Sequence, residues 1–242
     1  MKPGGYRKDR KGNRQEAEEV LPLFPSLSFS SSTSLLPSAL VAGVDEVGRG
    51  ALFGPVVAAA CILPESALDE LTALGVRDSK QLSATARERL AVKIRAVAVD
   101  CQIGMASVRE IERLNILQAT LLAMKRAILK LKVQPQLCLI DGNQRVPGLL
   151  IPQETMVKGD CHALAIAAAS IVAKVWRDRL IVRLAAKYPE YDLTNNKGYG
   201  TAKHRQALQR WGPSPQHRLS FGICGVDDRS PSLECDVPVP DA

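Results

Sequence analysis

From residue 40 onward, short apolar runs alternate with stretches of helical periodicity, and this alternation constrains the fold more than any other feature. Five runs have the length and composition of strands: residues 40–45, 55–63, 99–107, 137–141 and 154–160. The first two flank the glycine-rich turn EVGRGALFG, which predicts neighbouring antiparallel strands. Alternating strands and helices predict an α/β domain with a central sheet, whose strand order the sequence does not reveal.

Three helical stretches lie between and after these runs. Ser83 and Asn115 are suitable N-caps for helices over residues 84–97 and 116–131. The second has apolar residues at the helical period, at positions 117, 121, 124, 128 and 131. The third stretch, 161–188, is Ala-rich at first, which allows a close approach to a sheet, and then becomes basic.

The two ends of the chain differ from the middle in composition. Residues 1–38 are basic and then Ser- and Pro-rich without either periodicity, which predicts a disordered extension; acids and prolines argue against a signal or transit peptide. Residues 225–242 predict a disordered acidic tail. The folded domain is therefore expected over residues 39–224, with C-terminal helices from about 178.

Positive charge is concentrated in two places. The formal net charge is +7; residues 1–14 hold six basic side chains and one acid, and residues 174–218 hold ten Lys or Arg and three acids. A localised cationic stretch is typical of solvated helix faces or of a track for phosphates. The apolar runs are all broken before the roughly 18 residues that a membrane span needs, which excludes an integral membrane protein.

The six cysteines, at positions 61, 101, 138, 161, 224 and 235, include no C-x-x-C pair. Four of them lie in apolar or Ala-rich surroundings, where cysteine usually acts as a small buried hydrophobe. We expect reduced thiols in a cytoplasmic protein, not a zinc site or a disulfide framework.

Four carboxylates, those of Asp45, Glu46, Asp141 and Asp160, lie at strand ends or at a helix start. Such acids repel one another unless a divalent cation is bound, and hard oxygen ligands suit Mg²⁺ or Mn²⁺. Each acid alone also fits an ordinary turn or cap. Asp45 and Glu46 are adjacent, so strict strand alternation sends them to opposite faces. Both serve one site only if the strand ends there, which the following glycines permit.

Several motifs in one order complete this picture. They are DEVGRG at 45–50, DSKQLS at 78–83, NIL at 115–117, DGN at 141–143, KGD at 158–160 and GYGT at 198–201. In this order they resemble bacterial ribonuclease HII, of the type 2 ribonuclease H family, over about residues 40 to 222. The resemblance implies a ribonuclease H-like fold, with a mixed five-stranded sheet flanked by helices and a small C-terminal helical region.

The resemblance also implies an activity. The family hydrolyses the RNA strand of RNA/DNA hybrids and cuts on the 5′ side of a ribonucleotide embedded in duplex DNA. Its metal-binding acids match Asp45, Glu46, Asp141 and Asp160. Two Mg²⁺ or Mn²⁺ ions held by shared carboxylates can activate a water and stabilise the leaving oxygen, giving a 5′-phosphate and a 3′-hydroxyl.

The remaining implied roles concern substrate recognition. In the family, the turn that corresponds to Gly48, Arg49 and Gly50 recognises the 2′-hydroxyl and phosphates at the RNA–DNA junction, and the tyrosine matched by Tyr199 packs on the deoxyribose beyond it. Glycines let the backbone approach a sugar closely. Lys80 and Lys158 are candidates to neutralise phosphates. Ala51 stands where many members carry proline, which should reduce the rigidity of the turn.

Alternatives remain at this point. Ribonuclease HIII shares the fold, but it usually has lysine where Arg49 stands and carries a folded N-terminal domain. A resolvase-like nuclease would also use four acids, and a non-catalytic nucleic-acid binder is expected to have lost at least one. The histidines, His162 included, show no zinc-type spacing. We expect a monomer that acts on nucleic acid away from membranes; a polymerase-clamp partner is not readable.

Overall fold

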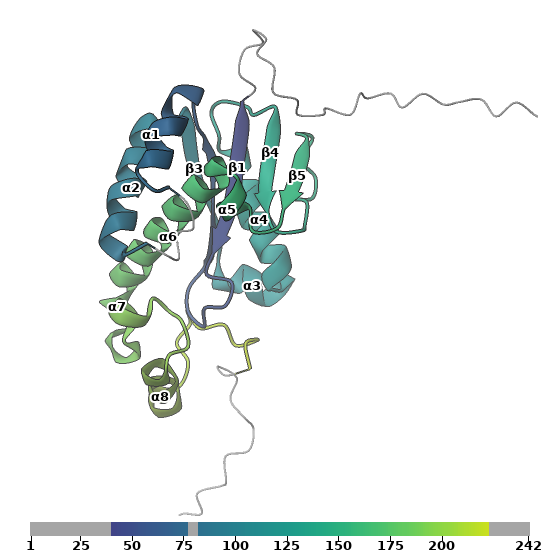
Figure 1. Cartoon of the computed structure of the whole chain (residues 1–242). Coiled ribbons are helices and arrows are strands. Elements are labelled where there is room, and N and C mark those ends of the chain that lie inside the picture. Colours follow the sequence, from purple (N-terminus) through teal and green to yellow (C-terminus); the bar gives the residue numbers. More distant parts are fainter. Residues whose placement is uncertain (1–39, 77–81, 223–242) are drawn as a thin grey trace, which may run out of the picture. The chain divides into compact units, whose positions relative to one another are not determined.

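A five-stranded mixed sheet in the order β3-β2-β1-β4-β5 forms the centre of the structure, with helices on both faces (Figure 1). The structure is a computed structural model and describes residues 40–76 and 82–222. The predicted extension at 1–38 and tail at 225–242 lie outside these residues. The α/β class and the mixed five-stranded sheet predicted from the sequence are confirmed.

The strands follow the five apolar runs. They are β1 (Val41–Val47), β2 (Val56–Ile62), β3 (Asp100–Ala106), β4 (Leu137–Asp141) and β5 (Gln153–Met156). The first three are antiparallel neighbours, as expected for β1 and β2, whereas β4 pairs parallel with both β1 and β5. The fifth run was expected to extend to residue 160, but β5 ends earlier because residues 159–162 turn into a short helix.

Helices cover the two faces of the sheet. One face packs on α4 (Ile116–Leu129), which follows α3 (Val108–Leu114). The other face packs on α6 (Leu164–Ala185), with α2 (Ala84–Val97), α1 (Leu68–Ala73) and the 3-10 turn η1 (Glu65–Ala67) outside it. Strand alternation divides the fully buried β2 between these two cores: Ala58 and Ala60 face α4, whereas Ala59 and Cys61 face α6.

Two strand glycines let helix backbones rest directly on the sheet. A Cβ at Gly43 of β1 would lie 2.1 Å from the Ala165 carbonyl carbon in α6, and a Cβ at Gly104 of β3 would lie 2.1 Å from the Ala123 carbonyl oxygen in α4. No side chain fits into either contact. The Ala-rich start of α6 allows the approach from the helix side, as the sequence predicts.

The Ala-rich stretch 161–188 is not one helix. A four-residue helix, α5 (Gly159–His162), precedes α6, and the two are separated at Ala163, whose backbone is extended (φ −125°, ψ 116°) and not helical. Residue 178 falls inside α6. The separate C-terminal elements begin later, with η2 (Pro189–Tyr191), α7 (Leu193–Asn196) and α8 (Ala202–Trp211).

The C-terminal elements form a third small core with the loop that joins β1 to β2. Phe53 of that loop is fully buried between Ile181, Tyr191 and Leu208, and it forms a β-bridge with His217. The loop that follows the acid-bearing strand is therefore held by the C-terminal region of the chain.

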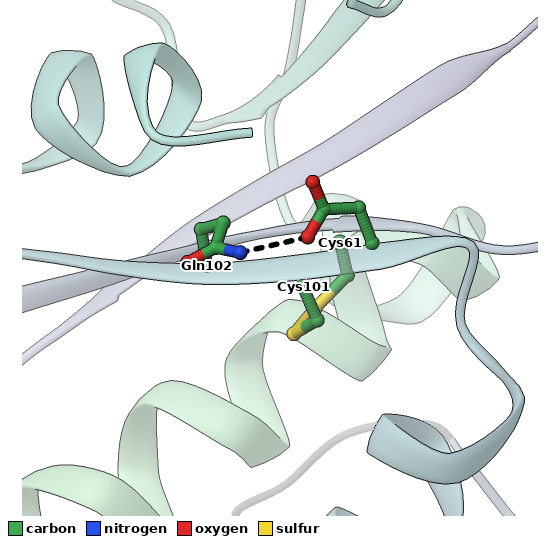
Figure 2. The surroundings of a disulfide bond; sticks show 4 residues. Cys61, Cys101 and Gln102 are labelled. Carbon is green, nitrogen blue, oxygen red and sulfur yellow. Dashed lines mark hydrogen bonds between the residues drawn. A yellow bond between two sulfur atoms is a disulfide. The ribbon is translucent and has the colours of Figure 1, made fainter. Parts of the chain in front are cut away.

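Cys61 and Cys101 are joined by a disulfide (Figure 2). They occupy directly opposed positions of the antiparallel β2–β3 pair, with Cα atoms 4.3 Å apart. The expectation of reduced thiols is thus wrong for this pair. The register of the two strands brings together residues 40 positions apart, and no cysteine motif in the sequence indicates that register. Of the other cysteines that the structure describes, Cys138 is buried and Cys161 is exposed.

Among the helices of the described residues, none combines the length and apolar character required to cross a bilayer.

Candidate active site

Three acidic side chains meet at the carboxyl end of β1 and β4. Carboxylate oxygens of Asp45, Glu46 and Asp141 all lie within 4.8 Å of one another. The register explains how β1 and β4 contribute together: the two strands run parallel and their last paired residues are Val44 and Ile140, so that the next residue of each is an aspartate. Parallel strands therefore bring the first and fourth strands' acids to one edge, as the family resemblance implies.

Glu46 joins this group although it is adjacent to Asp45 on the strand. We expected β1 to end at these residues, but it continues to Val47 on its β2 side. It is the pairing with β4 that ends earlier, at Val44. Beyond that point β1 has no neighbour on one side, and the longer Glu46 side chain reaches the same site as Asp45.

The carboxylates of Asp45, Glu46 and Asp141 lie close together, and burial and neighbouring charges raise the pKa of the first two. Burial raises the pKa of Asp45 well above its ordinary value, and the Glu46 and Asp141 carboxylates raise it further, against a hydrogen bond from Ser170 that lowers it. Burial also raises the pKa of Glu46, which Arg49 partly opposes from 3.4 Å. Hard oxygens that repel one another at this spacing fit a divalent cation.

Asp160 lies in the wall of the same cavity, outside the group of three. It is 7% exposed and sits within α5, so it is not the N-cap of a helix beginning at Cys161, the ordinary role that the sequence allowed. The start of α5 is fixed by Asp141, whose Oδ1 accepts a 2.7 Å hydrogen bond from the Gly159 amide. One acid of the trio thereby positions the helix that carries the fourth acid.

The cavity holds about 330 Å³ and contains most of the residues singled out from the sequence. Its wall is formed by Asp45, Glu46, Val47, Gly48, Arg49, Arg87, Asp141, Asp160, Ser170, Lys174 and Tyr199.

The turn after β1 needs glycine at its first position. Gly48 has φ +90°, and a Cβ there would lie 2.2 Å from Nε of Arg177. Arg49 and Gly50 are exposed, and a Cβ at Gly50 would meet no atom within 4 Å, so its surroundings are open. Ala51, the departure from the family pattern, is buried and its amide donates to the Gly48 carbonyl at 3.4 Å, a bond that proline could not make.

Tyr199 approaches the acids from the C-terminal region. Its half-buried ring has Lys174 Nζ and Arg177 Cζ each 5.4 Å from its centroid. Lys158, in contrast, is exposed on the turn before α5 and is not among the cavity-lining residues. Lys80 lies outside the described residues.

Three polar cavity residues were not singled out from the sequence. Ser170 and Lys174 are one helical turn apart on α6, and Arg87 projects from α2. Ser170 and Lys174 could have been identified from the sequence, because they are polar residues four positions apart in an otherwise apolar, Ala-rich helical stretch. Arg87 carries no such signal, since it lies on a helix with many charged residues.

Comparison with known proteins agrees with this geometry. The family model for ribonuclease HII matches residues 42–224. The chain is 69% identical over 189 residues to "Ribonuclease HII" of Trichodesmium erythraeum, covering 78% of this chain and 90% of that protein. It is 65% identical over 184 residues to "Ribonuclease HII" of Acaryochloris marina, covering 76% and 93%.

Solved structures show the same fold. Ribonuclease H2 from Pyrococcus horikoshii is 29% identical with a TM-score of 0.65, covering 76% of this chain and 94% of that one. The ribonuclease HII of Archaeoglobus fulgidus, solved in a complex with PCNA, is 31% identical with a TM-score of 0.61, covering 71% and 88%. A Bst ribonuclease HIII in complex with Mn²⁺, 22% identical, is similar in fold. The chain therefore belongs to the ribonuclease HII family, metal-dependent endonucleases that act on the RNA of RNA/DNA hybrids.

Proposed function

We propose that this protein cuts duplex DNA on the 5′ side of an embedded ribonucleotide as well as RNA in hybrids, with Asp45, Glu46, Asp141 and Asp160 as ligands of two Mg²⁺ or Mn²⁺ ions. The observation that supports this most directly is the trio of carboxylates within 4.8 Å of one another, one of which is nearly buried. When bound, the ions would supply an activated water and charge stabilisation for the leaving 3′ oxygen.

Hydrogen bonds from neighbouring residues orient two of the carboxylates. Asp45 is oriented by the Glu46 amide, which donates to its Oδ1 at 2.7 Å, and by the Ser170 hydroxyl. Asp141 is oriented by the Gly159 amide. These hydrogen bonds fix the carboxylates before any ion is present, so that little reorganisation accompanies binding.

The proposed position of the cut determines the nucleophile. A ribonucleotide's 2′-hydroxyl adjoins the phosphate on its 3′ side and cannot attack the phosphate on its 5′ side. Cleavage on the 5′ side therefore requires water as the nucleophile and leaves a 5′-phosphate and a 3′-hydroxyl. An activated water at a carboxylate-held metal site meets that requirement.

Recognition of the substrate is assigned to the two loops beside the acids. Gly48 and Arg49 line the cavity and the exposed Gly50 follows them, so that the backbone of this turn would test for a 2′-hydroxyl, the group that distinguishes RNA from DNA. Tyr199 presents its ring to the same cavity and would pack on the deoxyribose that follows. Lys80 and Lys158 would contact phosphates farther along the duplex.

The test uses end-labelled duplex DNA that contains one ribonucleotide. With Mg²⁺ or Mn²⁺ we expect a single cut on its 5′ side, with a 3′-hydroxyl that a polymerase can extend, and no cut after chelation. An otherwise identical all-DNA duplex is the matched control and should stay intact. A cut on the 3′ side with a 2′,3′-cyclic phosphate, or equal cutting of the control duplex, would contradict the proposal.

A further inference from the structure

Arg177 is a charged residue in an unusual place. It lies in α6 with 0% exposure, and within the described part of the chain no carboxylate forms an ion pair with it. Desolvating a guanidinium costs several kcal/mol unless its donors are satisfied. Here they are satisfied by backbone carbonyls, and the identity of those carbonyls indicates what the residue does.

The three carbonyls come from two segments far apart in the sequence. Nε donates to the Pro55 carbonyl at 3.2 Å and Nη2 to the Phe53 carbonyl at 3.0 Å, both in the loop that joins β1 to β2. Nη1 donates to the Lys197 carbonyl at 2.9 Å, two residues before Tyr199. One planar guanidinium thus fastens the loop of the glycine turn to the turn of the tyrosine.

The same side chain also touches the recognition elements themselves. Its Cζ lies 5.4 Å from the centroid of the Tyr199 ring, within the range of a cation–π contact. Its Nε occupies the space that a Cβ on Gly48 would need. Arg177 therefore lies between the first residue of the glycine turn and the tyrosine ring, and its size sets how far apart they stand.

We propose that Arg177 is a positioning residue that sets the spacing between the Gly48–Gly50 turn and Tyr199, and thereby the preference for a ribonucleotide followed by DNA. The inference rests on the proposed reading of the junction by these two elements. A ribonucleotide and the next deoxyribose have a fixed separation along the strand. Only a fixed spacing of the two elements can test both sugars at once.

Arg218 provides a matched control. It is equally buried, and it donates to the Gly54 carbonyl from Nε and Nη2 and to the Arg49 carbonyl from Nη1 at 2.8 Å. These acceptors all belong to the β1–β2 loop, and none belongs to the turn at 197–199. Loosening Arg218 should disturb the loop without separating it specifically from Tyr199.

The experiment compares kcat/KM on two substrates, a duplex with one embedded ribonucleotide and an RNA/DNA hybrid, for wild type, Arg177→Lys, Arg218→Lys and Tyr199→Ala. Arg177→Lys retains the charge but not the planar set of donors. We expect it to lower the ratio of embedded to hybrid cleavage by about 10- to 100-fold, the scale of loss for a misplacement near 1 Å. Arg218→Lys should lower both activities in parallel.

A double variant gives the sharpest readout. If Arg177 acts through Tyr199, then adding Arg177→Lys to Tyr199→Ala should leave the already lowered ratio nearly unchanged. A folded Arg177→Lys protein with the wild-type ratio, or fully multiplicative losses in the double variant, would overturn the inference. A Tyr199→Ala protein with the wild-type ratio would instead overturn the proposed junction recognition itself.

Folding is followed by circular dichroism and thermal unfolding. Arg177→Gln and Arg177→Met replace the lysine variant if that protein does not fold, and the same ratio is measured on them. If none of the three folds, Arg177 is a residue of the core and the positioning role is rejected.

Discussion

His204 and His217 share a hydrogen bond between their Nε2 atoms, 3.0 Å apart, in the buried core of the C-terminal region. Their outer nitrogens fix the tautomers. His204 Nδ1 donates to the Tyr199 carbonyl at 2.9 Å, so its Nε2 accepts and the Nε2 of His217 donates. His217 Nδ1 then accepts from the Ser214 amide at 2.9 Å. Only the neutral pair satisfies all of these bonds.

The first prediction concerns acid stability. Burial lowers the pKa of both histidines; for His217, burial and then the neighbouring His204 together lower the pKa to about 4. Because the unfolded chain binds these protons more readily, stability is fully present above about pH 6.5 and is lost as the pH falls. His217 should contribute a loss of about 1.4 kcal/mol per pH unit as the pH decreases toward 4, and His204 acts in the same direction. Urea unfolding at several pH values measures this slope.

The variant that tests this slope is His217→Gln. It should be less stable at neutral pH and should lose the share of the pH dependence that His217 contributes. A wild-type free energy of unfolding that is constant between pH 6.5 and 5 would contradict the assignment of a neutral pair.

The second prediction concerns the acids. Asp45→Asn or Asp141→Asn should abolish detectable cleavage while the fold and substrate binding remain, because the amide removes charge with little change of shape. Asp160→Asn should be damaging but less severe, since Asp160 lies outside the group of three. Cleavage of the embedded ribonucleotide under saturating Mn²⁺ gives the measurement, with exposed Glu154→Gln as control. Activity within a few-fold of wild type in either of the first two variants would refute the metal-site assignment.

A third prediction follows from the raised pKa of Asp45. Its folded-state pKa lies above the unfolded value, so the stability it contributes is lost as the pH rises through the folded pKa. Without metal at neutral pH, Asp45→Asn should therefore unfold at a temperature equal to or above that of wild type. Adding Mn²⁺ should raise the melting temperature of wild type only. A variant that is several degrees less stable in chelator would show that the carboxylate is needed for packing.

The fourth prediction concerns Tyr199. Tyr199→Ala should lose most cleavage at a single embedded ribonucleotide and a smaller share on an all-RNA strand, which offers no deoxyribose beyond the cut. Arg177 and Arg218 are buried, but exposed cationic residues between them, such as Lys187 and Lys203, would contact phosphates irrespective of the sugar, so salt should weaken both reactions in parallel. The assay compares both substrates at matched ionic strength. Equal proportional losses would make Tyr199 a packing residue only.

The fifth prediction concerns the disulfide. Cys61→Ser or a reducing agent should lower the free energy of unfolding by roughly 2–4 kcal/mol, as for removal of a bond that closes a long loop. Cleavage should be unchanged below the melting transition. Mass-tagging of thiols in the unfolded, unreduced protein gives the direct count, and tagging of both Cys61 and Cys101 would contradict the bond.

The sequence predicted the parts of the fold that depend on local pattern. The apolar runs of β1, β2 and β4 and the caps Ser83 and Asn115 are found as expected, because strand and helix signals there are uninterrupted. The break at Ala163 was missed because alanine favours helix and nothing local opposes it. A tertiary contact, the hydrogen bond from the Gly159 amide in α5 to Asp141, accompanies the extended backbone at Ala163 and could not be read from local sequence.

The candidate site was predicted in composition but not in its supporting structure. The four acids could be chosen because each follows a strand or begins a helix. Arg177 and Arg218 could not be chosen, because an arginine bonded to backbone carbonyls is indistinguishable in sequence from a solvated one. The Cys61–Cys101 pair was missed because the register of β2 and β3, which places the two cysteines opposite each other, is not visible in the sequence.

The contact at Gly43 has a consequence for attempts to redesign this enzyme. Since the backbone of β1 rests on the backbone of α6 without an intervening side chain, the strand that bears Asp45 and the helix that bears Ser170 and Lys174 have a spacing that no substitution can reduce. Any larger residue at Gly43 can only force the two apart. Changes intended to alter substrate choice are therefore better made at Arg49 or Tyr199 than at Gly43, because a larger residue at Gly43 would move the strand that bears Asp45.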